Sequence, residues 1–194
     1  MITLLYHKSE GDEMINNIEI EYKLLVSKEN FEKLSDLYLN KQFIKQTNTY
    51  YDTPNNDLRK KHCAMRIREK DNKFMITLKV PTIRGHEEFE CYVNENTSNA
   101  INQSEVRKVL DELNISQDII VLGECTTYRA IVVTDKAELC FDINEYNQIT
   151  DYEIEYEQTC DHDGVTEFNK ILSQVGLVYT KNCASKIKRT LDSK

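Results

Sequence analysis

The stretch Ile18-Glu19-Ile20-Glu21-Tyr22-Lys23 alternates apolar and charged side chains. In an extended strand, successive side chains point to opposite faces. Glu19, Glu21 and Lys23 therefore share one face, and the apolar side chains line the other. The stretch predicts a strand over residues 17–26 with one face that is charged throughout.

Three later stretches place charged side chains on one strand face in the same way: Asp151, Glu153, Glu155 and Glu157; Arg66 and Arg68; and Lys79 with Thr77. The simplest interpretation is an ordinary sheet whose charged faces lie in solvent. Acidic residues on some strands and basic residues on others also fit a second arrangement, in which the charged faces line one shared cavity. Patterning alone leaves both arrangements open.

Length and composition indicate a globular protein. A chain of 194 residues, with 30% charged and 40% hydrophobic residues, suits one domain. Its apolar runs are all much shorter than the about 20 residues that a membrane span needs. The sequence also shows no secretory signal. Six scattered cysteines without CxxC spacing are typical of reduced thiols. A net charge of −8 argues against nonspecific nucleic-acid binding. We expect a cytoplasmic protein that binds neither membranes nor nucleic acid.

The hydrophobic periodicity of the chain predicts mainly strands, with a few amphipathic helices. The strands are expected at 17–26, 42–52, 63–70, 73–80, 87–93, 125–134, 137–145 and 149–158. The helices are expected at 28–39, 104–113 and 163–175, with a last short helix in the basic tail 181–189. Residues 1–14 lack periodicity and are expected to form a disordered extension, whereas residues 15–194 form a single domain.

Eight antiparallel strands in a chain of this length favour a closed barrel, because closure removes the sheet edges. The amphipathic helices need an apolar surface to cover. The fold class consistent with these two points is α+β: a closed eight-stranded antiparallel β-barrel, or tunnel, with helices packed outside. In this arrangement the charged strand faces point inward.

Several motifs occur in the order found in one known family: Glu19-Ile20-Glu21-Tyr22-Lys23 (ExExK), Tyr50-Tyr51-Asp52-Thr53-Pro54, Ala64-Met65-Arg66-Ile67-Arg68-Glu69, Thr77-Leu78-Lys79, Thr127-Tyr128-Arg129-Ala130, Phe141-Asp142, Glu153-Ile154-Glu155-Tyr156-Glu157 and Ser185-Lys186. In these motifs the chain resembles the CYTH superfamily, the triphosphate tunnel metalloenzymes, over about residues 17–190. It is most similar to the bacterial YjbK-like branch. The resemblance favours the tunnel over the solvent-exposed sheet.

The resemblance implies that the tunnel binds a triphosphate together with a divalent metal, Mg²⁺ or Mn²⁺. Such hard cations prefer carboxylate and phosphate oxygens. The residues that match the family's metal ligands are Glu19, Glu21, Asp142, Glu153 and Glu155. Glu157 continues the same strand face and is a weaker candidate.

The matching basic residues are expected to bind the substrate and to act in catalysis: Lys23, Arg66, Arg68, Lys79, Arg129 and Lys186. Arginine can grip phosphate through two parallel hydrogen bonds, whereas lysine supplies a mobile point charge. In the C-terminal tail, Lys181, Lys188 and Arg189 lie close enough to Lys186 to leave the choice among them open. Arg84, Glu88 and Glu90 are further, weaker candidates.

The favoured function is metal-dependent hydrolysis of a triphosphate, with inorganic tripolyphosphate as substrate because no base-binding motif is evident. The sequence contains no HExxH, no GxSxG and no glycine-rich phosphate loop. One alternative is a class IV-type adenylate cyclase, which forms cyclic AMP and pyrophosphate from ATP. Others are a thiamine triphosphatase and a non-catalytic sensor of polyphosphate or nucleotide. The expected partner is a small polyanion, and both a monomer and a homodimer remain open.

Overall fold

The computed structural model describes residues 14–38, 42–83 and 85–194. Within these residues the strands are β1 (Ile15–Glu19), β2 (Glu21–Val26), β3 (Ile44–Asp52), β4 (Ala64–Lys70), β5 (Lys73–Pro81), β6 (His86–Val93), β7 (Ile120–Val133), β8 (Ala137–Tyr146) and β9 (Ile149–Gln158). The helices are α1 (Lys28–Tyr38), α2 (Asp57–Lys60), α3 (Ser98–Gln103), α4 (Val106–Glu112), α5 (Gly164–Leu172), the 3₁₀ turn η1 (Ser173–Val175) and α6 (Lys186–Asp192).

The described residues form nine strands instead of the predicted eight, because the first predicted strand is divided at Ile20. On one side of this residue β1 pairs with β6, and on the other side β2 pairs with β9. The hydrogen-bonding partner of the chain therefore changes at Ile20. The alternation of side chains predicts an extended backbone but not which strand pairs with it. The sequence pattern therefore did not reveal the division.

Chain contacts divide the protein into two compact units. Among the described residues, unit 1 contains Ile20–Lys45 and Thr126–Lys186, and unit 2 contains 14–19, Gln46–Cys125 and Ile187–Lys194. In unit 1 the strands follow the order β7-β8-β9-β2, and in unit 2 the order β1-β6-β5-β4-β3. Neighbouring strands in each order are antiparallel. Each unit has a hydrophobic core of its own.

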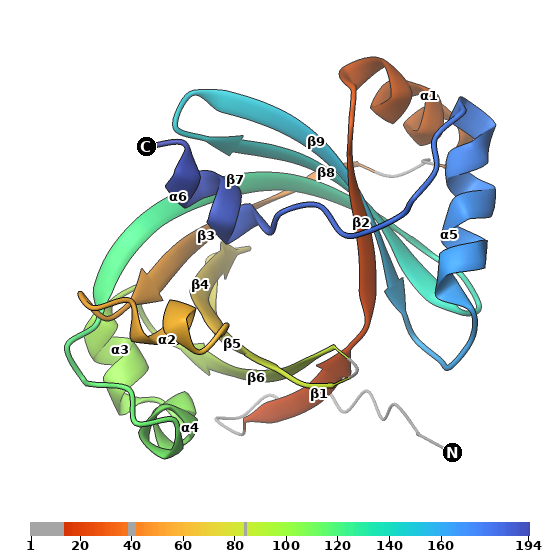
Figure 1. Cartoon of the computed structure of the whole chain (residues 1–194). Coiled ribbons are helices and arrows are strands. Elements are labelled where there is room, and N and C mark those ends of the chain that lie inside the picture. The colour runs from red at the N-terminus through yellow and green to blue at the C-terminus, as the bar shows by residue number, and fades with distance from the viewer. Residues whose placement is uncertain (1–13, 39–41, 84) are drawn as a thin grey trace. The chain divides into compact units, whose positions relative to one another are not determined.

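In unit 1, helices α1 and α5 cover one face of the sheet formed by β8, β9 and β2 (Figure 1). Phe31 of α1 and Phe168 of α5 are buried in the core with Phe141 and Ile154 of the strands. Burial of each such side chain contributes about 1.5–3 kcal/mol. The predicted helices at 28–39 and 163–175 are confirmed, and their apolar stripes fix which face of this sheet is left for the charged residues.

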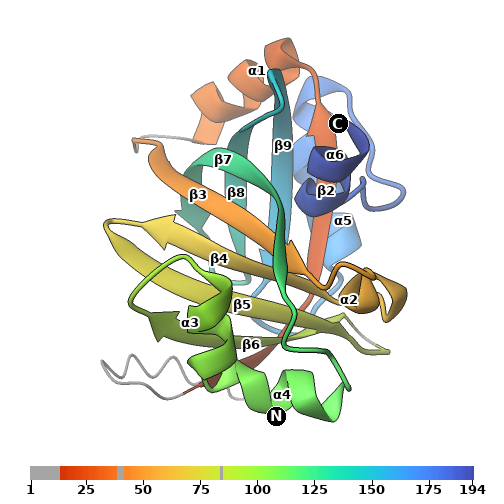
Figure 2. The same cartoon turned by 90° about the vertical axis from the view of Figure 1, so that its left-hand side faces the viewer.

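In unit 2, helices α3 and α4 lie beside strands β4 to β6 (Figure 2). Ile101 and Leu110 of these helices are buried with Ile67 and Ile76 of the strands. The helix predicted at 104–113 corresponds to α4, whereas α3 and α2 were not predicted. Neither is long enough for an apolar period to emerge, and Thr97 caps α3 by accepting a hydrogen bond from the Ala100 backbone.

Two hairpins close through two-residue turns in the left-handed region. Asp71 and Asn72 have φ angles of 51° and 57°, and Asn147 and Gln148 have φ angles of 45° and 65°. Positive φ at both central residues is the geometry that matches the twist of paired strands. The two-residue loop predicted between β4 and β5 is confirmed.

The predicted disordered extension lies outside the described residues, apart from Met14. That residues 15–194 form a single domain stays a prediction. Each helix in the described part of the chain is too short or too polar to cross a lipid bilayer.

Candidate functional site

The charged face of β9 is buried. Glu153 is 0% and Glu155 is 6% exposed, and the alternating residues Ile154 and Tyr156 are buried on the opposite face. Burial of a carboxylate without a partner costs several kcal/mol, so these groups must find compensating charges. This observation excludes the solvent-exposed interpretation for β9.

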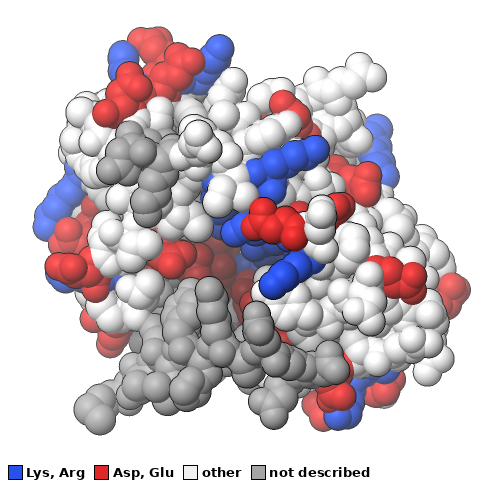
Figure 3. Space-filling view, turned by 180° about the vertical axis from the view of Figure 1, so that it is seen from behind, with Lys and Arg blue, Asp and Glu red and all other residues white. Residues whose placement is uncertain are grey.

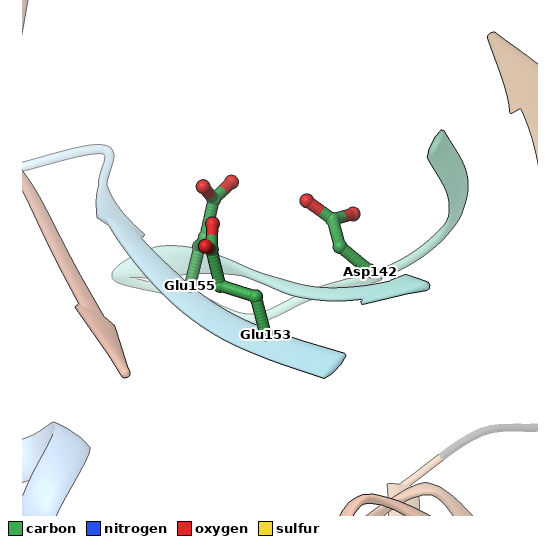
Figure 4. A group of neighbouring side chains, drawn as sticks. All are labelled: Asp142, Glu153 and Glu155. Carbon is green, nitrogen blue, oxygen red and sulfur yellow. The ribbon is translucent and has the colours of Figure 1, made fainter. Parts of the chain in front are cut away.

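The carboxylates of Asp142, Glu153 and Glu155 form a cluster, which we call the acidic triad. Asp142 lies opposite Glu153 in the β8–β9 pair, and Glu155 follows two residues later on the same face of β9. One oxygen of each residue lies within 4.8 Å of the other two. Figure 4 shows the three side chains on the same side of the strand pair. The register of one hairpin therefore assembles the triad.

Two cationic side chains, 15% and 10% exposed, contact the acidic triad. Arg129 Nε donates to Asp142 Oδ1 at 2.7 Å, and the guanidinium group also contacts Glu155. Lys186 Nζ lies 2.8 Å from Asp142 Oδ2 and 2.7 Å from Glu155 Oε1, and it also contacts Glu153. The Lys186 ammonium group therefore touches all three acids.

Lys186 reaches the triad because the preceding segment is fastened to β2. Asn182 Oδ1 accepts a hydrogen bond from the Lys23 backbone at 2.8 Å, and Asn182 Nδ2 donates to the Glu21 carbonyl at 3.1 Å. Cys183 N donates to the Lys23 carbonyl at 3.1 Å. Among the basic residues of the tail, the structure thus places Lys186 at the triad. Sequence reasoning missed Asn182, because an isolated polar residue in a segment without periodicity gives no signal.

The pairing determines how the triad ionises. Burial raises the pKa of a carboxyl group, but Lys186 and Arg129 hold the pKa of Glu155 well below its usual 4.5. Burial lowers the pKa of a lysine, but Asp142, Glu153 and Glu155 hold the pKa of Lys186 well above its usual 10.5. Opposite charges thus keep one another ionised in a buried setting.

A further ion pair lies on β2. Lys23 Nζ contacts the Glu21 carboxylate, and the two side chains are 13% and 10% exposed. Lys23 also lies opposite Glu155 in the β2–β9 pair. Burial alone would lower the pKa of Lys23, but the charges of Glu21 and Glu155 raise it above its usual value. Lys23, like Arg129 and Lys186, is therefore paired with a carboxylate.

The donor set of the acidic triad fits a hard divalent cation. Mg²⁺ and Mn²⁺ prefer carboxylate oxygens, and three such oxygens lie close enough to share one ion. Of the five metal ligands predicted from sequence, the structure brings together Asp142, Glu153 and Glu155. Glu21 instead pairs with Lys23.

Unit 2 holds a charged cluster of its own around Lys79. The Lys79 ammonium group contacts the carboxylates of Glu19 and Glu88, and the side chains of these two acids are 11% and 13% exposed. Burial raises the pKa of Glu88, but the charges of Lys79 and Arg66 bring it below its usual 4.5. Glu19, which the sequence grouped with the metal ligands, thus binds a lysine in this structure.

The alternation predicted for β4 is confirmed. Met65 and Ile67 are 1% and 0% exposed, and Arg66 and Arg68 point to the other face of the strand. Arg68 Nε donates to Asn48 Oδ1 at 3.1 Å. Arg66 Nε is buried and has no hydrogen-bond partner among the described residues. A buried cationic donor of this kind favours an anionic ligand.

The weaker candidates have separate environments. Glu90 accepts a hydrogen bond from Thr77 Oγ1 at 2.8 Å. Glu157 is half-buried and lies opposite Glu21 in the β2–β9 pair. Arg84 lies outside the described residues. Glu88 contacts Lys79, a predicted basic site residue.

Charged residues are also spread over the surface. On the face drawn in Figure 3, acidic and basic side chains are interspersed among the described residues. The charged clusters of the two units differ from this surface pattern because their side chains are buried or nearly buried.

Comparison with known proteins supports the predicted family. The model of the CYTH domain matches residues 17–191. The chain is 36% identical over 170 residues to the candidate triphosphatase YjbK of Bacillus subtilis (strain 168). The alignment covers 84% of this chain and 90% of that protein.

Solved structures of similar proteins also support the predicted family and fold. A candidate adenylate cyclase from Bacillus halodurans is 32% identical with a TM-score of 0.80, over 90% of this chain and 97% of the other. The candidate adenylyl cyclase HpAC1 from Hippeastrum, described as having a dominant triphosphatase activity, is 27% identical with a TM-score of 0.73, over 91% and 97%. The predicted fold class, an antiparallel β-barrel with helices, is confirmed. The chain belongs to the CYTH domain family.

Proposed function

We propose that this protein is a divalent-metal-dependent triphosphatase whose substrate is inorganic tripolyphosphate. The observation that carries the proposal is the buried acidic triad in contact with Arg129 and Lys186. The naming of the Bacillus subtilis relative as a candidate triphosphatase and the triphosphatase activity of the Hippeastrum protein support the reaction class.

In the proposed site, Asp142, Glu153 and Glu155 hold Mg²⁺ or Mn²⁺. When bound, the ion neutralises charge on the phosphate oxygens and stabilises the charge that develops in the transition state. The side chains that hold it are anchored on paired strands, so their carboxylates are preorganised.

The basic residues of unit 1 bind and orient the phosphate chain. Arg129 offers a planar fork to phosphate oxygens, and Lys23 and Lys186 offer ammonium groups. Donors that are in place before the reaction stabilise the developing negative charge without reorganisation. In unit 2, Arg66, Arg68 and Lys79 present further cations, and the buried Nε of Arg66 is suited to a phosphate oxygen.

The reaction needs no nucleophile from the protein. A water oxygen attaches to the terminal phosphorus as the bond to the bridging oxygen breaks, so that tripolyphosphate yields pyrophosphate and orthophosphate. Inorganic tripolyphosphate is favoured because the sequence has no evident base-binding motif.

A class IV-type adenylate cyclase is the second candidate. It is supported by the solved relative from Bacillus halodurans, which is described as a candidate adenylate cyclase. In that reaction the 3′-hydroxyl of ATP takes the place of water, and the same carboxylates and cations serve both reactions.

One assay separates the candidates. The purified protein is incubated with Mg²⁺ or Mn²⁺ and with tripolyphosphate, ATP or thiamine triphosphate, and the products are resolved. The proposal requires pyrophosphate and orthophosphate from tripolyphosphate at the highest rate. Cyclic AMP from ATP would establish the cyclase, fastest hydrolysis of thiamine triphosphate a thiamine triphosphatase, and binding without turnover a sensor.

Two substitutions on β8 make the assay specific for the site. Asp142→Asn alters the triad, and Glu145→Gln alters an exposed carboxylate on the same strand. We expect loss of turnover in D142N and wild-type turnover in E145Q. Equal rates in both variants would remove the triad from the reaction.

A further inference from the structure

The ammonium group of Lys186 lies where the three carboxylates of the acidic triad converge. Its Nζ is 2.8 Å from Asp142 and 2.7 Å from Glu155, and it contacts Glu153 as well. An ammonium group has three donors, and here one acidic residue faces each of them. Lys186 therefore contacts every carboxylate of the triad.

A divalent ion held by all three carboxylates would lie close to the position of this ammonium group. The three acidic oxygens lie within 4.8 Å of one another, so an ion that coordinates all of them must lie in the space between them. Metal–oxygen distances for Mg²⁺ are about 2.0–2.1 Å. A second cation within about 3 Å would be strongly repelled in a buried site. Lys186 and the metal therefore exclude each other.

The ammonium group of Lys186 can move away from the acidic triad. It is the first residue of α6, and its ammonium group sits on a flexible four-carbon stem. The backbone upstream is held to β2 through Asn182. Rotation about the side-chain bonds can thus withdraw the ammonium group while the chain stays in place. Arg129 differs, because it lies directly opposite Asp142 in the β7–β8 pair and grips it through two nitrogens.

We propose that Lys186 is a built-in competitor for the metal. Its single positive charge offsets part of the negative charge of the three carboxylates when no ion is bound, and a divalent ion must displace it to bind. The displaced ammonium group then becomes available to the phosphates of the substrate. The inference rests on the proposed function in one respect, namely that a divalent ion binds the triad.

Metal affinity in the absence of substrate tests the displacement. Binding of Mn²⁺ to the metal-free full chain is followed by electron paramagnetic resonance in the wild type, Lys186→Met and Lys23→Met. The affinity of a site that is competent for only a fraction of the time falls by that fraction. If Lys186 occupies the triad for about nine-tenths of the time, its removal tightens Mn²⁺ binding about tenfold.

Lys23→Met is the matched control. Lys23 is a nearly buried lysine on β2 that forms an ion pair with Glu21, so its loss removes one nearby positive charge without vacating the triad. We expect a clearly smaller gain in Mn²⁺ affinity in K23M than in K186M. Equal gains in both variants, or no gain in K186M, would overturn the proposal.

A second measurement uses the wild-type protein, so that it holds even if K186M does not fold. The Lys186 ammonium group is observed by nitrogen-15 NMR, and Lys186→Arg assigns its signal. Saturation with Mg²⁺ should shift this signal or remove it through faster exchange with water. An unchanged signal at saturation would overturn the displacement. If the wild type still hydrolyses tripolyphosphate in that case, the proposed function stands without it.

Discussion

Arg129 and Asp142 lie directly opposite each other in the β7–β8 pair and meet through two nitrogen–oxygen contacts. Arg129 Nε lies 2.7 Å from Asp142 Oδ1, and a terminal guanidinium nitrogen lies 2.5 Å from Oδ2. The Asp142 side chain has no exposed surface. A two-point contact of this kind fixes the orientation of the carboxylate as well as its charge. Outer groups that orient metal ligands are as much part of a metal site as the ligands are.

Replacement of Arg129 by lysine should therefore impair both roles of this residue. Arg129→Lys keeps the charge but loses the planar fork. We expect turnover of tripolyphosphate to fall by about 10²–10³, as for the loss of a preorganised donor. Steady-state kinetics with circular dichroism as the folding control measures this effect. Wild-type kinetics in R129K would show that the fork is not used.

Removal of the metal should abolish turnover and leave the protein folded. With excess EDTA, we expect no release of orthophosphate from tripolyphosphate, and full recovery on addition of Mg²⁺ or Mn²⁺. Because an ion that binds the folded state stabilises it, the melting temperature should rise with metal concentration. Full turnover in EDTA would contradict the assignment of the acidic triad as a metal site.

Much of the fold and part of the site could be predicted because the two faces of a strand appear in the sequence as an alternation of apolar and charged residues. The alternation identified Arg66 and Arg68 as residues of one face of β4, and Glu153 and Glu155 as residues of one face of β9. The turn residues Asp71-Asn72 identified a hairpin, because few residue types tolerate positive φ. These signals are local, so a single sequence carries them.

The partners of the charged residues could not be predicted from the sequence. Glu19 and Glu21 are two residues apart and share a pattern, but β1 pairs with β6 and β2 pairs with β9. Glu19 consequently meets Lys79 of β5, whereas Glu21 contacts Lys23 on its own strand. The contact of Lys186 with Asp142 joins residues far apart in the chain and depends on the pairing of β2 with the segment before α6. Such contacts follow from strand register, which side-chain alternation leaves undefined.

The ion pair between Glu88 and Lys79 should make stability sensitive to acid. The folded pKa of Glu88 lies below its usual 4.5, so this carboxylate contributes stability that is complete above that pH and is lost as the pH falls through the folded pKa. We expect Glu88→Gln to lower the free energy of unfolding by about 1–3 kcal/mol near neutral pH. The difference between E88Q and the wild type should shrink at pH values below 4.5.

Urea unfolding of both proteins at a series of pH values checks this dependence. Glu145→Gln, which alters an exposed carboxylate on β8, is the control and should show a small difference at every pH. A difference for E88Q that stays constant through the acid range would mean that Glu88 is not held ionised by its neighbours.

The strand β4 allows the sharpest test of the division between catalytic and structural residues. Arg66 and Arg68 point to one face, and Met65 and Ile67 are buried on the other. Removal of a preorganised donor typically costs about 10²–10³ in rate, so we expect R66A and R68A to lose turnover by about this factor. Their melting temperatures should change little in comparison, because the apolar face of the strand is intact.

The two apolar residues of β4 should behave in the opposite way. Met65→Ala and Ile67→Ala remove buried side chains from the core of unit 2, which costs about 2–5 kcal/mol of stability. The folded fraction of each variant should nevertheless hydrolyse tripolyphosphate at nearly the wild-type rate. Turnover and melting temperature are measured for all four alanine variants. If R66A and R68A keep normal turnover while the apolar variants lose stability, β4 has a structural role alone, and the buried Nε of Arg66 has no part in binding phosphate.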